Sequence, residues 1–344
     1  MSKRLLRIAV PAAALVLALT ACGGKQVGGG AAGTAGGSGG SDQPTVAFVP
    51  KLVGIPYFEA MKAGGDEAAK KLGVKFIYQG DTTADAAKQA EIVNSLIQQK
   101  VDVLAVAPND PSAIAPVLKR AADAGIKVMT TDTDAPESVR SVFVNQAESD
   151  AVGQATAEAL AQQMGGKGKW AIVSSGPTAA NLNAWIKVEK AYIAQKYPQM
   201  KFVDVKYAGE DQAVATQLTK DLISANPDLK GVIGQSSTAS PGVAQAITDL
   251  KLIGKVYSAG VATPKPMASY IKSGAQAKVV LWDAKNLGYL TVWAGQQLAQ
   301  GKQLQASNDV GDPVGTVTFD SATKNLLLGK PITFTKDNVD QYNF

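Results

Sequence analysis

Six short segments of the sequence place polar and aromatic side chains directly after runs of apolar residues. They comprise residues 51–58, 108–111, 132–134, 174–183, 235–238 and 282–283. Their Lys, Asp, Asn, Gln and Ser side chains supply directional hydrogen-bond donors and acceptors, and their aromatic rings supply flat apolar faces. Because every sugar hydroxyl both donates and accepts hydrogen bonds, this combination suits a polyhydroxylated ligand.

Asp132 is the residue that we expect to anchor such a ligand. It follows the strand-like run 127–130, and its carboxylate can accept hydrogen bonds from two hydroxyls. Each of these bonds is charge-assisted and about twice as strong as a neutral one. For Asp134 we favour a structural role, in which the side chain caps or braces the turn.

Four further candidates in these segments each have a structural alternative. Tyr57 and Phe58 either lay their rings on the apolar face of a sugar or belong to the hydrophobic core. Asn181 and Asn183 stand where a helix is expected to begin, so they are either N-caps or ligand donors.

The tryptophans divide into two groups. Trp282 stands at the end of an expected strand and either stacks on the ligand or packs in the core, while its neighbour Asp283 would bind a hydroxyl. Trp170, Trp185 and Trp293 have no polar company in the sequence, so we expect them to be packing residues.

A fold of alternating strands and helices must position these segments. The run 101–106 is apolar throughout, as a strand covered on both faces must be. The preceding segment, 86–97, repeats apolar residues at the spacing of one helix face. Because this alternation continues along the chain, it predicts a parallel sheet with helices on both sides.

The second half of the chain repeats the first. Residues 75–132 and 201–260 follow the same course of strand, turn, helix, buried strand, helix and strand. A period of this length predicts an α/β fold of two similar doubly wound parallel-sheet lobes joined by a hinge. Since ligands bind outside the carboxyl ends of the strands in such sheets, we expect the six segments to meet at a cleft between the lobes.

Composition excludes several classes of function. The 344 residues include no histidine and one cysteine, Cys22. Ser–His and Cys–His catalysis, histidine-ligated zinc sites, intramolecular disulfides and four-cysteine metal sites are therefore excluded. No calcium-loop motif is present, and we expect no metal and no cofactor. The net charge of +5 is not gathered into a basic run, so we expect no binding to nucleic acid.

The N-terminus has the pattern of a lipoprotein signal peptide. Lys3, Arg4 and Arg7 precede the apolar stretch 8–19, which ends in Leu19-Thr20-Ala21-Cys22. This ending is similar to the lipobox of bacterial lipoproteins, which implies that residues 1–21 are removed and that Cys22 carries the lipid. An ordinary signal peptide with an incidental cysteine is the alternative. Residues 22–43, mainly Gly, Ala and Ser, are expected to tether the protein to the extracytoplasmic face of the cell membrane.

The chain from residue 46 to its end resembles the type I periplasmic binding proteins of ABC importers, and within them the group that binds autoinducer-2 or rhamnose. The motifs that carry the resemblance are Pro50-Lys-Leu-Val-Gly54 with Tyr57-Phe58, Asp132-Thr-Asp134, Ser174-Ser175 before Asn183 and Trp185, Leu281-Trp-Asp283, Phe334-Thr-Lys-Asp-Asn338 and Gln341-Tyr-Asn-Phe344.

The resemblance implies a domain organisation and a set of partners. Three crossovers between the lobes would place residues 44–145 and about 284–344 in the first lobe and residues 146–283 in the second. The expected partners are a small sugar and the permease subunits of the importer, and the protein is expected to be a monomer. Lys51 would bind a ligand oxygen, with a merely solvated lysine as the alternative, and Asn145 would be a ligand or hinge residue.

Departures from the group bear on the ligand. The autoinducer-2 binders carry an Asp-Gln pair where this chain has Asn181-Leu182, and a Pro-x-Ala sequence where it has Gln235-Ser-Ser237. Loss of a carboxylate and gain of the side-chain donors Gln235 and Ser237 favour an intact sugar, such as rhamnose or a similar deoxyhexose, over autoinducer-2.

Three other functions were weighed against sugar uptake. Asp132 and Asp283 could form a glycosidase pair, but the resemblance is to proteins that bind without turnover, so we predict that the chain is not an enzyme. A transcriptional repressor shares this fold, but the signal peptide directs the chain out of the cytoplasm. A lipoprotein that senses a ligand for a sensor kinase stays open.

Overall fold

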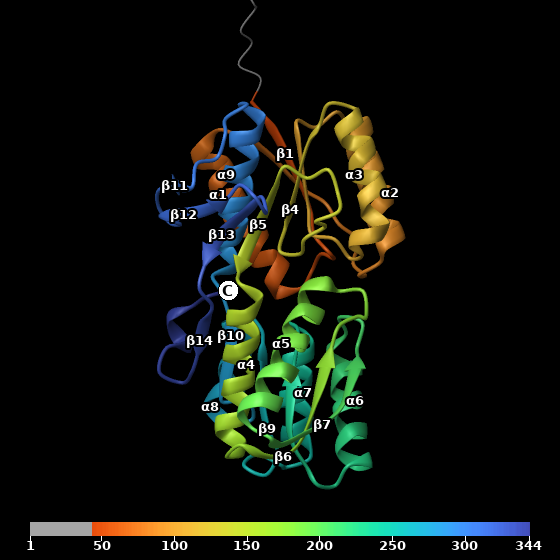
Figure 1. The fold of residues 1–344 in the computed structure, drawn as a ribbon, viewed down its shortest axis with the longest axis vertical. Coiled ribbons are helices and arrows are strands. Elements are labelled where there is room, and N and C mark those ends of the chain that lie inside the picture. Colours follow the sequence, from red (N-terminus) through yellow and green to blue (C-terminus); the bar gives the residue numbers. More distant parts are fainter. Residues whose placement is uncertain (1–42) are drawn as a thin grey trace, which may run out of the picture. The chain divides into compact units, whose positions relative to one another are not determined.

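The computed structural model describes residues 43–344. This part of the chain forms two α/β lobes, each built around one sheet (Figure 1). The predicted signal peptide, Cys22 and all but the last residue of the predicted tether lie outside the described residues. Among the helices of residues 43–344, none has the length and apolar character needed to cross a membrane.

Eight strands form the sheet of the first lobe. They are β1 (Thr45–Val49), β2 (Lys75–Tyr78), β3 (Val103–Val106), β4 (Lys127–Thr131), β5 (Val142–Ala147), β11 (Ser307–Asp309), β12 (Thr316–Asp320) and β13 (Asn325–Gly329). Their order is β11-β12-β13-β5-β4-β3-β1-β2. The six strands from β13 to β2 are parallel, and β11 and β12 add an antiparallel edge.

Helices cover both faces of this sheet, as the fully apolar β3 predicted. They are α1 (Pro56–Leu72), α2 (Ala86–Gln98), α3 (Pro111–Asp123) and α9 (Ala284–Ala299). Alternate residues of a strand point to opposite faces. Val46 and Phe48 of β1 therefore pack in the cluster that contains α1 and α9, whereas Ala47 and Val49 pack with α2 and α3.

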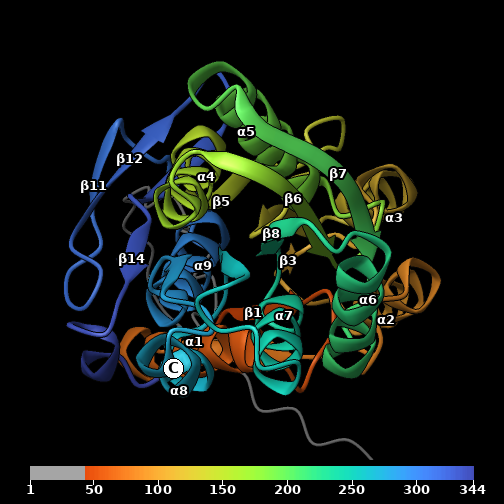
Figure 2. The same cartoon turned by 90° about the horizontal axis from the view of Figure 1, so that it is seen from below.

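The second lobe repeats this plan with six strands. They are β6 (Lys167–Ser174), β7 (Gln199–Tyr207), β8 (Leu229–Gly234), β9 (Tyr257–Val261), β10 (Lys278–Leu281) and β14 (Ile332–Phe334), in the order β14-β10-β9-β8-β6-β7. Its helices are α4 (Ser149–Met164), α5 (Ala180–Lys196), α6 (Gln212–Ala225), α7 (Ala239–Asp249) and α8 (Pro264–Ser273). Figure 2 shows β6 and β7 between α4 and α5 on one side and α6 and α7 on the other.

The two sheets confirm the fold predicted from the internal repeat. The order β4-β3-β1-β2 in the first sheet corresponds to β9-β8-β6-β7 in the second. The sheets are mixed at their edges, however, because β11 and β12 in one and β14 in the other run antiparallel to their neighbours. The prediction of parallel sheets therefore holds for all strands except β11, β12 and β14, which form one edge of each sheet.

Helix α9 is fixed to the first lobe by close backbone contact with α1. A Cβ atom on Gly64 of α1 would lie 1.8 Å from the carbonyl oxygen of Lys285, and one on Gly288 of α9 would lie 1.8 Å from that of Met61. Only glycine permits this approach. The chain therefore returns to the first lobe at residue 284.

The last strand corrects the predicted domain organisation. We expected the chain to stay in the first lobe from about residue 284 to residue 344, but β14 pairs with β10 in the second sheet. The segment that follows also contacts the second lobe, since Asp340 pairs with Lys272 of α8 and the Phe344 carbonyl accepts a hydrogen bond from the Lys265 amide. A three-residue strand leaves too short a pattern to be found in the sequence.

Aspartates begin four of the helices that follow strands. Asp85, Asp110, Asp211 and Asp283 each accept a hydrogen bond from a backbone amide in the first turn of α2, α3, α6 and α9, respectively. These N-caps satisfy amides that have no partner within the helix. They therefore fix the helix ends that border the space between the two sheets.

Candidate functional site

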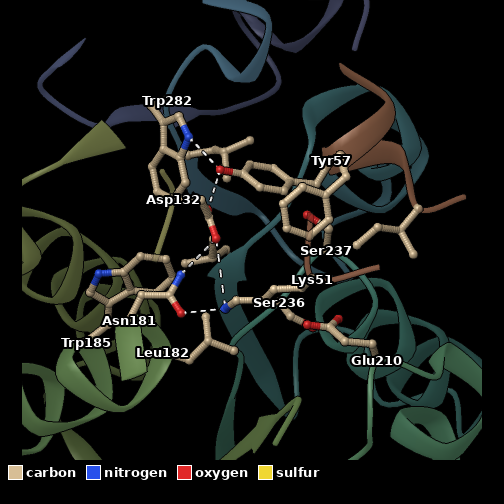
Figure 3. Close-up of a pocket in the computed structure, with 14 residues that line it drawn as sticks. Lys51, Tyr57, Asp132, Asn181, Leu182, Trp185, Glu210, Ser236, Ser237 and Trp282 are labelled. Atoms are coloured by element: carbon tan, nitrogen blue, oxygen red, sulfur yellow. Dashed lines mark hydrogen bonds and ion pairs between the residues drawn. The ribbon is translucent and has the colours of Figure 1, made fainter. Parts of the chain in front are cut away.

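A cavity of about 40 Å³ lies between the lobes, where strands of both sheets end (Figure 3). Its lining residues are Lys51, Ile55, Tyr57, Phe58, Asp132, Asn181, Leu182, Trp185, Glu210, Ser236, Ser237, Val261, Leu281 and Trp282. Seven of the eleven predicted ligand residues are in this group. The three charged members are Lys51, Asp132 and Glu210, so the cavity wall carries more negative than positive formal charge.

Asp132 lies at the centre of the polar network. It follows β4 in a tight turn closed by a bridge between Thr131 and Thr133, and its φ of 63° is in the left-handed region that Asp tolerates better than most residues. One carboxylate oxygen, Oδ1, accepts a hydrogen bond of 2.7 Å from the Tyr57 hydroxyl. The other accepts from Thr133 Oγ1 at 3.0 Å and from Asn181 Nδ2 at 3.5 Å. With 3% of its surface exposed, this buried carboxylate is held by donors from both lobes.

Lys51 joins the two lobes beside Asp132. Its Nζ donates a hydrogen bond of 2.7 Å to Asn181 Oδ1 and lies 3.9 Å from Asp132 Oδ2. Burial lowers the pKa of Lys51, and the negative charges of Asp132 and Glu210 oppose that shift. The side chain is thus a buried cation whose charge is balanced by carboxylates.

Tyr57 and Trp282 extend the network along one wall. Trp282 Nε1 donates to the Tyr57 hydroxyl at 3.1 Å, and that hydroxyl donates to Asp132. Burial and the adjacent Asp132 carboxylate raise the pKa of Tyr57 well above its usual value. The phenol therefore keeps its proton and orients the Asp132 carboxylate.

Aromatic rings form the apolar part of the wall. Trp282 lies edge-to-face against both Tyr57 and Trp185, with ring centroids 5.9 and 5.6 Å away, and Tyr57 lies in the same way against Phe58 at 5.0 Å. The sequence predicted Trp185 to be a packing residue, and it is buried, but it also lines the cavity. Its place in α5 brings it there, one turn after Asn181 and Leu182.

The structure places four predicted ligand residues away from the cavity lining. Asp283 caps α9 through the amide of Asn286, and Gln235 is fully buried with its amide donating to Glu189 at 2.8 Å. Asn183 donates to the Pro177 carbonyl at 2.7 Å. Asn145 lies within β5, paired with β13. The side chains of Asp283, Gln235 and Asn183 thus already have partners among neighbouring groups.

Two structural roles can be compared directly with the predictions. The N-cap of α5 is Ala179, without a side-chain hydrogen bond, so the alternative of Asn181 and Asn183 as N-caps is wrong. Asp134 braces its turn as predicted: it accepts hydrogen bonds from Thr130 Oγ1, the Ala135 amide and Arg140.

Several lining residues were not among the predicted ligand residues, and of these Glu210 and Ser236 are polar. Glu210 stands in the turn between β7 and α6. This turn was absent from our six segments because β7 is half-exposed along most of its length and offers no apolar run. The internal repeat contained the signal, since the turn after β7 corresponds to the turn after β2.

Among residues 43–344 there is no group of three or more metal-ligating side chains.

Comparisons with known proteins show relatives along most of the chain. Residues 46–303 match the family described as "Periplasmic binding protein domain". The ribose import binding protein of Bacillus subtilis (strain 168) is 27% identical over 271 residues, which cover 78% of this chain and 86% of that protein.

Two solved structures are similar over most of the chain. LsrB from Clostridium saccharobutylicum, in complex with AI-2, is 30% identical with a TM-score of 0.81, covering 87% of this chain and 100% of that one. A solute-binding protein of an ABC transporter from Clostridium phytofermentas, with bound L-rhamnose, is 29% identical with a TM-score of 0.81, covering 87% and 98% of the two chains.

Proposed function

Because this chain belongs to the periplasmic binding protein domain family, we propose that it captures a small uncharged sugar between its lobes and delivers it to the permease of an ABC importer. The observation that carries the proposal is Asp132, a buried carboxylate in the cavity whose two oxygens are oriented by donors of Tyr57, Thr133 and Asn181. A bound sugar would exchange some of these donors for its own hydroxyls. The chain is a binding protein and not an enzyme, as predicted.

Rhamnose or a similar deoxyhexose is the ligand that we favour. A methyl group in place of a hydroxyl needs an apolar surface, and Leu182, Val261 and Leu281 offer one beside the aromatic rings. The Clostridium phytofermentas protein with bound L-rhamnose supports this assignment.

Autoinducer-2 is the second candidate ligand. It is favoured by the similarity to the Clostridium saccharobutylicum protein in complex with AI-2. Against it, position 181 holds an asparagine where the autoinducer-2 binders carry an aspartate. Lys51 therefore lies beside an amide and one carboxylate, that of Asp132.

We further propose that the protein acts as a monomer on the extracytoplasmic face of the cell membrane, anchored through lipid on Cys22. The basis is the N-terminal sequence, with its basic residues, apolar stretch and lipobox-like ending. The Gly-rich segment after Cys22 would let the binding lobes reach the permease.

A thermal-shift screen of the purified protein tests the ligand assignment. The panel is L-rhamnose, D-ribose, D-arabinose, D-allose and autoinducer-2, each at up to millimolar concentration. A ligand present at 100 times its dissociation constant stabilises the folded protein by about 2.7 kcal/mol, which raises the melting temperature by several degrees. Stabilisation by autoinducer-2 alone would select the second candidate, and no stabilisation by any of the five would overturn the proposal.

A further inference from the structure

Glu210 is the one charged residue of the cavity wall with no assigned role. It stands in the turn between β7 and α6, across the cavity from Asn181 and Trp185, as Figure 3 shows. Its carboxylate also borders a second space of about 100 Å³ between the lobes, which shares Lys51 with the first. Glu210 and Lys51 thus stand together where the two spaces adjoin.

One hydrogen bond orients this carboxylate. The backbone of Glu210 has a φ of 63°, in the left-handed region that is uncommon for a non-glycine residue. Thr238 Oγ1 donates a hydrogen bond of 2.6 Å to Glu210 Oε2. Within residues 43–344, the other oxygen, Oε1, takes part in no hydrogen bond, so it is available as an acceptor.

The negative charge of Glu210 acts on Lys51 in the cavity wall. Its carboxylate favours the protonated form of Lys51, opposing the effect of burial on that residue's pKa. Lys51 nevertheless makes its short contact with Asn181, and no ion pair within 4.0 Å joins it to Glu210 in the described part of the chain. A ligand hydroxyl between the two groups could accept from Lys51 and donate to Glu210 at once.

We propose that Glu210 is a ligand-binding residue that supplies a second carboxylate, on the second lobe, opposite Asp132 on the first. It would bind a ligand hydroxyl through Oε1. With two carboxylates and one lysine around the ligand, the site selects an uncharged polyol and rejects sugar phosphates and sugar acids. This inference rests on the proposed sugar-binding function. It requires a ligand that presents one hydroxyl to Asp132 and another to Glu210.

Calorimetric titration of three proteins tests the assignment. Wild type, Glu210→Gln and Asp211→Asn are each titrated with L-rhamnose, D-ribose, D-arabinose and D-allose, and the sugar that binds wild type most tightly is compared across them. Because a hydrogen bond to a charged group is stronger than one to an amide, Glu210→Gln should weaken binding on the order of 10- to 100-fold. Asp211→Asn is the matched control. It removes the same charge from the adjacent residue, which caps α6 outside the cavity, and asparagine caps helices equally well.

The outcomes separate the role of Glu210 from the sugar-binding function of the protein. Tight binding by wild type and Asp211→Asn with at least tenfold weaker binding by Glu210→Gln supports the assignment. Binding by Glu210→Gln within threefold of wild type would overturn it and leave the sugar-binding function intact. Binding of D-ribose 5-phosphate as tight as that of D-ribose by wild type would overturn the selection for uncharged ligands. Failure of wild type to bind any of the four sugars would overturn the assignment together with the function on which it rests.

Discussion

Lys51 Nζ, on the first lobe, donates a 2.7 Å hydrogen bond to Asn181 Oδ1, on the second, and so ties the two lobes together across the cavity. The bond crosses the space where we expect the ligand. Small-molecule sites usually have volumes of roughly 300–1,000 Å³, whereas this cavity has about 40 Å³. A monosaccharide must therefore separate these two side chains, and the lobes that carry them, before it can bind.

Hinge motion is the first consequence. In small-angle scattering, we expect Asn181→Ala without sugar to have a larger radius of gyration than wild type, because the hydrogen bonds of Asn181 with Lys51 and Asp132 across the cavity are lost. Saturation with the best sugar should bring the radii of the two proteins together. Asn183→Ala is the control, since Asn183 bonds to Pro177 within its own lobe and should match wild type. Identical curves for Asn181→Ala and wild type in the absence of sugar would contradict this account.

Asp132 and Asp134 should separate affinity from stability. Asp132→Ala leaves sugar hydroxyls and the Tyr57 hydroxyl without their acceptor, and the buried Lys51 without its ion-pair partner. We therefore expect affinity to fall about 30-fold to 1000-fold. Asp134→Ala should bind the same sugar within threefold of wild type but melt at a lower temperature, because the buried guanidinium of Arg140 loses its partner. Calorimetric titration and thermal melting of both variants measure the two effects. The reverse pattern, in which Asp134→Ala loses sugar binding and Asp132→Ala keeps it, would show that we chose the wrong carboxylate.

Residues that follow a buried strand were the part of the site most accessible to sequence reasoning. Lys51 and Asp132 stand directly after the apolar runs that become β1 and β4, and the fold dictates that such positions border the cleft. Glu210 was not predicted as a site residue because β7 lacks an apolar run. The place of Trp185 in the cavity wall was not predicted because it depends on the direction of α5. Gln235 was misassigned because its partner, the Glu189 side chain, becomes a neighbour only in three dimensions. Asp283 bonds to an amide three residues further on, which is a local N-cap that the sequence pattern could have indicated.

Lipidation of Cys22 can be tested in cells. Cys22→Ser should abolish incorporation of labelled fatty acid and release the protein from the membrane fraction, or leave it as an uncleaved precursor, because the thiol is the only acceptor for the lipid in this sequence. Sugar binding should persist in the purified variant. Unchanged labelling and membrane fractionation would rule out Cys22 as the anchor.

Glu189 should make the stability of the second lobe depend on pH. It is fully buried in α5, and burial raises its pKa to about 8, which the hydrogen bond from Gln235 only partly opposes. Among residues 43–344, the buried acceptors Glu189 Oε2 and Gln235 Oε1 have no hydrogen-bond donor. A proton on the carboxyl group would let Glu189 donate as well as accept, so the folded protein favours the neutral acid.

The sign of the effect follows from this raised pKa. The stabilisation is complete below the ordinary pKa of about 4.5 that Glu189 has in the unfolded chain, and it is lost as pH rises through about 8. One proton gives a slope of about 1.4 kcal/mol per pH unit between these limits. Glu189→Gln presents an amide donor at every pH. In urea titrations, the free energy of unfolding of wild type should therefore fall relative to that of Glu189→Gln as pH rises from 5 to 8.

Glu158→Gln is the control, because the hydrogen bonds of Tyr192, Tyr197 and Lys196 outweigh partial burial and lower the pKa of Glu158 to about 2. The effect of this substitution on stability should be constant over this range. Parallel pH profiles for wild type and Glu189→Gln would mean that Glu189 is ionised in the folded protein and that the proton between Glu189 and Gln235 does not exist.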